Sequence, residues 1–158
     1  MMARTSSPIE KAAPQNLEAE RAVLGAILLD NEVLNAVREV LSPADFYDIR
    51  NRTIFAAMAT LADEGDPIDL ITIMGHLRGN KSLTAAGGPE YIPRLAIEVP
   101  TAEGAVHYAK MIRTLAVRRE SLRAGEIYLE ALADGEHPDK AREYFEESLA
   151  RVGDRKSK

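Results

Sequence analysis

The chain has 158 residues, of which 46% are hydrophobic and 28% charged, with a net charge of −5 and no cysteine. This length and apolar fraction predict a folded globular domain, and the lack of cysteine excludes disulfide scaffolds, thiol nucleophiles and cysteine-ligated metals. The three histidines have no ligand spacing, which argues against a zinc centre. There is no bilayer-length apolar run and no signal-peptide pattern, so we expect a cytoplasmic protein that does not contact membranes.

The amino-terminal residues predict a leader followed by short helices. Residues 1–16 show no hydrophobic periodicity and are expected to form a flexible leader. From Leu17, apolar residues recur every three or four positions, which predicts a helix capped by Asn16 and broken at Asp30. Residues 33–41 carry a second, shorter apolar face.

Three more helices are expected in the first hundred residues. One begins at Pro43, which suits a first helical position, and continues along an apolar stripe to Leu61. Another covers about 69–77, where β-branched residues leave a strand as the competing interpretation. A third begins at Gly87. Together these elements predict a helical head over residues 17–99.

The longest uninterrupted helical pattern runs from Thr101, as N-cap, to about Ala133. Such a helix would be about 45 Å long and would have to project from the head. A near-heptad apolar seam follows it, imperfect at Arg119 and Glu126. The apolar members of the seam are Ala105, Tyr108, Ile112, Leu115, Leu122 and Leu129.

A turn after Asp134 separates this helix from a last amphipathic one, Pro138 to Val152. The fold class predicted is therefore all-α: the small multi-helix head and a projecting antiparallel helical hairpin, residues 101–152. Residues 153–158 are expected to be a disordered tail.

Catalytic and phosphate-binding motifs fail on spacing. Gly75 and Gly79 are separated by three residues and Lys81 is displaced by one, which does not fit a phosphate loop. The neighbouring carboxylates Glu18 and Glu20 are interpreted as a solvated helix face rather than an acid–base pair. No catalytic, metal-binding or cofactor-binding residue is therefore assigned.

Charge is distributed unevenly along the chain. Residues 1–100 carry 9 basic and 14 acidic residues, whereas residues 101–158 carry 11 of each. Within the second part, a basic segment could touch nucleic acid, although the acidic surroundings make direct DNA binding weak or absent. Its cations are Lys110, Arg113, Arg118, Arg119 and Arg123.

Five motif blocks follow one another along the chain: Pro14–Leu29, Leu41–Tyr47 with Arg52, Ile54 and Phe55, Gly65–Asp69 with Thr72, Gly87–Tyr91, and Val99–Ala102 with Tyr108 and Ala109. Their order and spacing resemble the amino-terminal domain of bacterial replicative DNA helicases of the DnaB type. The blocks cover residues 14–123, and the rest of the hairpin matches in length rather than in letters. Asn51 departs from the family, in which histidine often stands there.

The resemblance implies a non-catalytic collar domain that assembles a helicase ring during DNA replication. Hairpins of this family pair between subunits, giving dimers or a trimer of dimers, and the outer surface receives primase, with a helicase loader as a further partner. Tyr108, Ile112, Leu115 and Arg119 are expected at a partner interface, with either another copy of the chain or a different protein. Matching by motif places Glu18, Tyr91, Leu122 and Tyr128 in regions that resemble the primase-contacting surface; an ordinary core position is the alternative for Tyr91.

In this family ATP and Mg²⁺ bind a separate motor domain that carries a Walker A loop, which this sequence does not contain. The chain is thus expected to be either an excised domain of an ATP-dependent helicase or a freestanding phage-type or mobile-element homologue that regulates a host helicase. A helical DNA-binding module that uses Arg113, Arg118, Arg119 and Arg123 is the third alternative.

Overall fold

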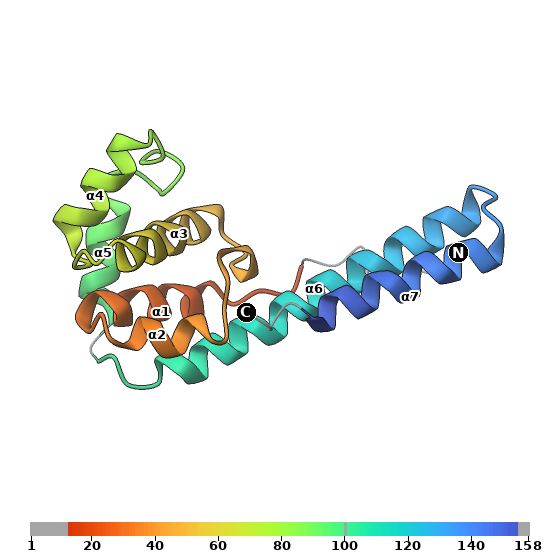
Figure 1. The fold of residues 1–158 in the computed structure, drawn as a ribbon, viewed down its shortest axis with the longest axis horizontal. Helices are drawn as coiled ribbons and strands as arrows, with labels where there is room; N and C mark the ends of the chain where they lie inside the picture. The colour runs from red at the N-terminus through yellow and green to blue at the C-terminus, as the bar shows by residue number, and fades with distance from the viewer. Residues whose placement is uncertain (1–12, 100, 155–158) are drawn as a thin grey trace, which may run out of the picture. The chain divides into compact units, whose positions relative to one another are not determined.

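The computed structural model describes residues 13–99 and 101–154 (Figure 1). The regular elements in these ranges are helical, which confirms the all-α prediction. They are α1 (Leu17–Leu29), α2 (Val33–Arg38), the 3₁₀ turn η2 (Pro43–Asp45), α3 (Ile49–Asp63), α4 (Leu70–Gly79), α5 (Tyr91–Glu98), α6 (Ala105–Ala133) and α7 (Pro138–Asp154). In the same ranges no helix is long and apolar enough to cross a membrane. The predicted leader and tail lie largely outside the described residues.

The helices form two compact units, and the boundary between them lies inside α6. The head unit is Gln15–Arg113, and the hairpin unit contains the described residues from Thr114 onward together with Ala13 and Pro14. The first turns of α6 belong to the head because Ala109 and Ile112 are buried in its core.

The head core forms where α1 packs against α3 and α5. Its side chains are apolar and almost fully inaccessible to solvent, and each contributes about 1.5–3 kcal/mol through burial. They include Leu24, Ile27, Phe46, Ile54, Phe55, Met58, Ile92 and Leu95. The rings of Phe46 and Phe55 lie 4.9 Å apart between centroids.

The close packing of α1 on α5 requires a glycine. A Cβ atom at Gly25 would overlap Val99 Cγ2 and lie 2.6 Å from the carbonyl oxygen of Leu95. Gly25 is itself buried in the middle of α1. The absence of a side chain at this position therefore sets the distance between the two helices.

Local capping explains where α1 and α4 begin. Asn16 Oδ1 accepts a hydrogen bond from Ala19 N at 2.9 Å, as its predicted N-cap role requires. Asp69 and Thr72 form a reciprocal capping box at the start of α4, with Asp69 Oδ1 accepting from Thr72 N at 2.8 Å. The segment after Asp69 is thus helical, from Leu70 to Gly79, and the strand alternative is wrong.

The helix predicted to run from Pro43 to Leu61 is divided in the structure. The 3₁₀ turn ends at Asp45 and α3 starts at Ile49, where Asp48 Oδ1 accepts from Arg50 N at 2.9 Å. Between them, Phe46 adopts an extended backbone and buries its ring completely. The prediction was wrong here because an uninterrupted helix would not place this ring in the core.

Two other helices begin later than predicted. Gly87 and Gly88 have φ of +97° and +82°, so they form a left-handed turn, and α5 starts only at Tyr91. Gly104, with φ of +84°, likewise precedes α6, whose first residue is Ala105 rather than Thr101. Helical periodicity does not report these backbone reversals.

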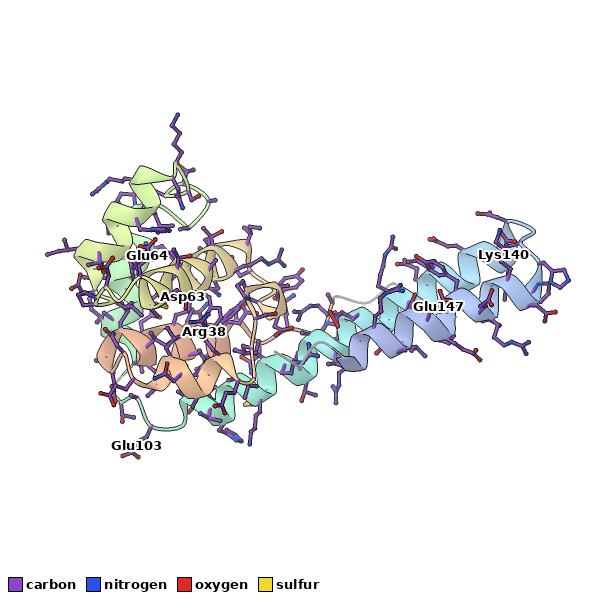
Figure 2. The ribbon with its side chains drawn as sticks, in the orientation of Figure 1. Arg38, Asp63, Glu64, Glu103, Lys140 and Glu147 are labelled. Atoms are coloured by element: carbon purple, nitrogen blue, oxygen red, sulfur yellow. The ribbon has the colours of Figure 1, made fainter. Side chains whose placement is uncertain are left out.

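Polar contacts fix the outer part of the head. Asn31 is bonded twice to the backbone of Ile68, through Nδ2 to the carbonyl at 2.9 Å and through Oδ1 from the N–H at 2.8 Å. Arg38 of α2 and Asp63 of α3 form an exposed ion pair at 2.9 Å (Figure 2). The exposed ion pair adds little stability. The two partly buried hydrogen bonds between Asn31 and Ile68 hold the loop before α4 in place.

The hairpin unit is antiparallel, as predicted. Gly135, with φ of +96°, ends α6, and the N–H of Glu136 returns to the Ala131 carbonyl at 2.9 Å. Pro138 then opens α7. The Tyr128 ring stacks on that of Phe145, with centroids 5.0 Å apart, and so joins the two helices.

Candidate interaction surfaces

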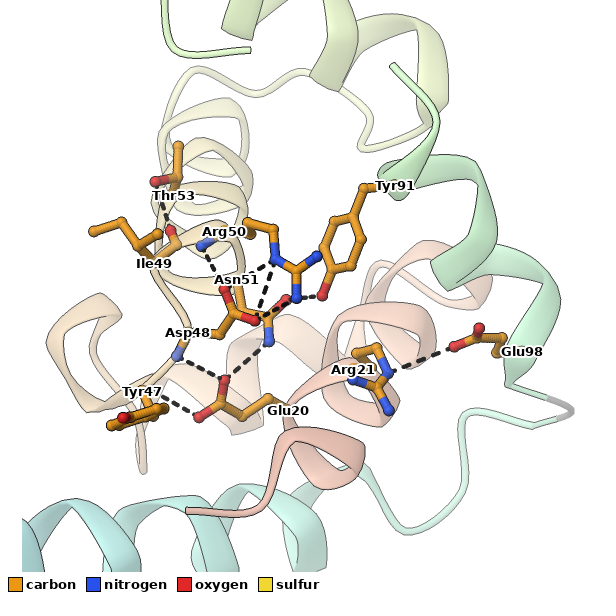
Figure 3. A network of polar contacts seen from close by, with 10 residues as sticks. All are labelled: Glu20, Arg21, Tyr47, Asp48, Ile49, Arg50, Asn51, Thr53, Tyr91 and Glu98. Atoms are coloured by element: carbon orange, nitrogen blue, oxygen red, sulfur yellow. Dashed lines mark hydrogen bonds and ion pairs between the residues drawn. The ribbon is translucent and has the colours of Figure 1, made fainter. Parts of the chain in front are cut away.

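A buried polar network links α1, α3 and α5 (Figure 3). The Glu20 carboxylate, on a residue only 1% exposed, accepts hydrogen bonds from Tyr47 N at 2.7 Å, Asp48 N at 3.3 Å and Asn51 Nδ2 at 2.9 Å. Asn51 Oδ1 accepts in turn from the Tyr91 hydroxyl at 2.5 Å. The carboxylate therefore organises both the start of α3 and the position of the Tyr91 ring.

This network corrects the interpretation of Glu18 and Glu20 as one solvated face. Glu18 is exposed, but Glu20 is buried, because donors from the segment before α3 satisfy its charge. Neither Glu20 nor Asn51 was predicted as a functional residue. Their bonding partners are 27–40 positions away in sequence, so no local pattern could have identified them.

Tyr91 is covered on one side by a surface ion pair. The Arg50 guanidinium lies 4.2 Å from the centre of the Tyr91 ring and bonds Asp48 at 2.6 Å. The hydrogen bond from Arg50 holds the pKa of the Asp48 carboxyl below its usual value, and burial opposes that effect. Burial raises the pKa of Tyr91 above its usual value, so the hydroxyl stays protonated as a donor at neutral pH. Tyr91 is thus half-buried, and its interface role stays a prediction.

Glu18 and Tyr108 line one groove of the head unit. It has a volume of about 650 Å³ and lies between α1, the end of α5 and the first turns of α6. Tyr108 is 37% exposed, and an ion pair between Arg21 and Glu98, at 3.6 Å, lies at the same place. The groove therefore brings together two predicted interface residues that are ninety positions apart.

The buried stripe of α6 agrees with the predicted seam only in part. Within the head, Ala105, Ala109 and Ile112 are 0–3% exposed, and Ile112 is a core residue. Tyr108, predicted on this seam, is 37% exposed and lines the groove instead. Ala105 and Ile112 belong to the predicted seam, whereas Ala109 does not. The small side chain of Ala109 lets neighbouring helices approach closely.

A leucine face lies on the hairpin unit. Leu115, Leu122 and Leu129 are spaced by seven residues and share one side of α6. Ala124 is buried on the side of α6 that faces α7. Around the axis of α6, Leu122 and Leu129 lie roughly 140–160° from Ala124. Leu129 is 54% exposed. We call these three residues the leucine face; Leu115 and Leu122 are partly exposed, and Leu129 is exposed.

The remaining predicted hairpin residues have other contacts. Arg119 is half-buried and donates to the Pro14 carbonyl oxygen at 2.7 Å. Tyr128 is half-buried against Phe145. In residues 13–99 and 101–154, the histidine and carboxylate side chains do not gather into a group that could hold a metal ion.

Similarity to known proteins was found in sequence and in structure. The family model described as "DnaB-like helicase N terminal domain" matches residues 12–114. The chain is 41% identical over 114 residues to the replicative DNA helicase DnaB of Geobacillus stearothermophilus, and 40% identical to the replicative DNA helicase DnaC of Bacillus subtilis. In each case the alignment covers 72% of this chain and 25% of the relative, so the chain spans about a quarter of these proteins.

Solved structures agree with this fold. The crystal structure of the N-terminal domain of DnaB helicase from Mycobacterium tuberculosis matches with a TM-score of 0.83 at 29% identity, covering 89% of this chain and 99% of that one. A DnaB-like replicative helicase, whose structure is described with its interactions with primase, has the same fold with a TM-score of 0.71 at 22% identity, over 85% of this chain and 31% of that one. With motif blocks, helical fold and family model all in agreement over the head unit, the chain belongs to the DnaB-like helicase N-terminal domain family.

Proposed function

We propose that this domain is a non-catalytic assembly and docking module of a replicative helicase ring. In this proposal the domain forms the collar of the ring, and ATP hydrolysis with Mg²⁺ belongs to a separate motor domain of the parent helicase. The curated relatives are replicative helicases that are about four times longer than the matched region, which supports this division of labour.

The leucine face carries the self-association part of the proposal. Three leucines at seven-residue spacing make a seam of the kind by which helices pair. Leaving Leu129 half-exposed costs free energy in the isolated chain, and a second hairpin packed against this face would recover it. Gly125 has open space around it on the same helix, which allows a partner helix to approach.

Primase is the proposed partner of the outer surface. The solved relative described with its primase supports this choice, and a loader is a further candidate for the same surface. Glu18 and Tyr91 on the head, with Tyr128 on the hairpin, are the residues proposed to contact it. Leu122, matched by motif to the same region, belongs in this proposal to the leucine face, where two hairpins pair. Direct contact with DNA is proposed to be minor, because the chain carries a net charge of −5.

Sedimentation velocity at about 10 µM tests the assembly role. The wild-type chain should form dimers or larger species, and Leu129→Glu should shift it to monomers because a buried charge would oppose pairing. Ile71→Glu is the matched control, since Ile71 is 84% exposed on α4. A strictly monomeric wild-type chain that also fails to bind the primase of its own organism would contradict the proposal.

A further inference from the structure

A second groove lies on the hairpin unit, on the flank of α6 away from the leucine face. It runs between α6 and α7 with a volume of about 560 Å³. Its apolar lining comes from Ala124, Ile127, Tyr144 and Val152. Tyr144 is 51% exposed, so its ring offers contact area that the hairpin itself does not cover.

Basic residues line both edges of this groove. Arg119 and Arg123 are one turn apart on α6, and Arg151 lies on α7; Glu120 is the one carboxylate among the lining residues. Arg123 is 64% exposed and pairs with Glu126 at 2.6 Å, an exposed pair that a competing carboxylate can exchange at little cost. An apolar floor with cationic edges is thus presented by two rigid helices.

We infer that this groove docks an acidic amphipathic helix of a partner protein. Such a helix would lay its apolar side chains on Tyr144 and Ile127 and place carboxylates at i and i+4 opposite Arg119 and Arg123. The stretch from Arg119 to Ile127 is about 12 Å long, which suits two turns of a bound helix.

Charge and polarity select this occupant over two others. Nucleic acid would place hydrated phosphates over a floor built from four apolar residues, which is unfavourable. The amino-terminal residues 1–12 of this chain carry Arg4 and Lys11 against Glu10, so their net charge does not complement the groove. An acidic amphipathic segment would place apolar side chains on the floor of the groove and carboxylates beside the arginines at its edges.

The test uses a fluorescein-labelled helical peptide about 18 residues long, with leucines along one face and glutamates on its flanks, measured by anisotropy. A control peptide carries lysine in place of each glutamate. The glutamate peptide should bind at micromolar concentration, at least tenfold more tightly than the control, and more weakly as salt is raised.

Three variants locate the binding site. Arg123→Glu with Arg151→Glu should weaken binding of the glutamate peptide at least tenfold, and Tyr144→Ala should weaken it several-fold. Arg142→Glu, at another exposed arginine of α7 that pairs with Asp139, should leave it unchanged. Circular dichroism would verify that each variant keeps its helix content.

Equal binding of both peptides, full affinity in the double variant, or equally tight binding of a 20-nucleotide single-stranded DNA would overturn the inference. So would loss of self-association in the double variant, since the groove would then be an interface between copies. This inference extends the docking role proposed above but fails separately from it. A wild-type chain that self-associates yet ignores the peptide refutes only the groove, whereas a monomeric chain that binds it refutes only the assembly role.

Discussion

Removing the Glu20 carboxylate should be among the most damaging single changes on α1. Glu20→Ala deletes the acceptor for two short hydrogen bonds, from Tyr47 N and Asn51 Nδ2 at 2.7 and 2.9 Å, and for a longer one from Asp48 N at 3.3 Å. A buried donor left unsatisfied costs about 1–3 kcal/mol. With two donors fully affected and the third partly, the free energy of unfolding should fall by about 3–5 kcal/mol.

Glu18→Ala is the matched control for this experiment. Both carboxylates lie in the first turn of α1, so both variants lose the same favourable interaction with the helix dipole. Glu18 is exposed, and its removal should change stability by no more than about 0.5 kcal/mol. Glu20→Gln should fall between them, at about 1.5–3 kcal/mol, because one carbonyl acceptor remains while the charge is lost.

Urea denaturation at pH 7, followed by circular dichroism at 222 nm, measures all three variants. The reasoning fails if Glu20→Ala loses less than about 1 kcal/mol, or if Glu18→Ala loses as much. Either result would mean that the donors of the network find water instead of the carboxylate.

Four further variants test other parts of the head. Gly25→Ala should lower the free energy of unfolding, measured in urea, by about 1–3 kcal/mol because the added methyl group would collide with α5. Gly75 lies in open space on α4, so Gly75→Ala should raise it by up to about 1 kcal/mol. The opposite order of the two variants would refute the packing argument. Tyr91→Phe should cost about 1–3 kcal/mol by leaving a buried amide oxygen without its donor. Because burial raises the pKa of Tyr91 in the folded state, stability should fall as pH rises above about 10, less steeply in Tyr91→Phe, and equal slopes would count against this. The hydrogen bond from Arg50 lowers the pKa of Asp48 in the folded state. The contribution of Asp48 to stability is therefore present above its unfolded pKa of about 3.9 and is lost as pH falls below that value. Asp48→Asn should make stability depend less on pH on the acid side, and an unchanged pH dependence would argue against the Asp48–Arg50 ion pair.

The helices and most of their ends could be predicted from the sequence because the signals are local. Asn16 and Asp69 cap the helices that follow them, and Pro138 opens α7 after a glycine turn. The capping bonds span only three residues, so they do not depend on the rest of the fold. The interruption at Phe46 was missed because it arises from burial of the ring in the core, which a local pattern does not record.

The candidate sites divide in the same way. Glu18, Tyr91, Leu122 and Tyr128 were selected by motif, and the structure shows which of them are exposed without testing what they bind. The arginine-edged groove was not predicted at all. It depends on α7 lying beside α6, which brings Arg151 and Tyr144 next to residues that precede them by more than fifteen positions.

The sequence by itself determined an all-helical chain, its family and the approximate position of each helix, because capping, periodicity and motif order are written in neighbouring residues. Only the tertiary structure decided that Glu20 is buried and that Ala109 lies in the core beside Ala105 and Ile112. It also decided that Leu129 remains exposed on the hairpin. Whether a residue is buried depends on which distant segments pack against it. A charged residue can therefore lie in the core where hydrogen-bond donors surround it, and a leucine can stay exposed where no segment packs on it.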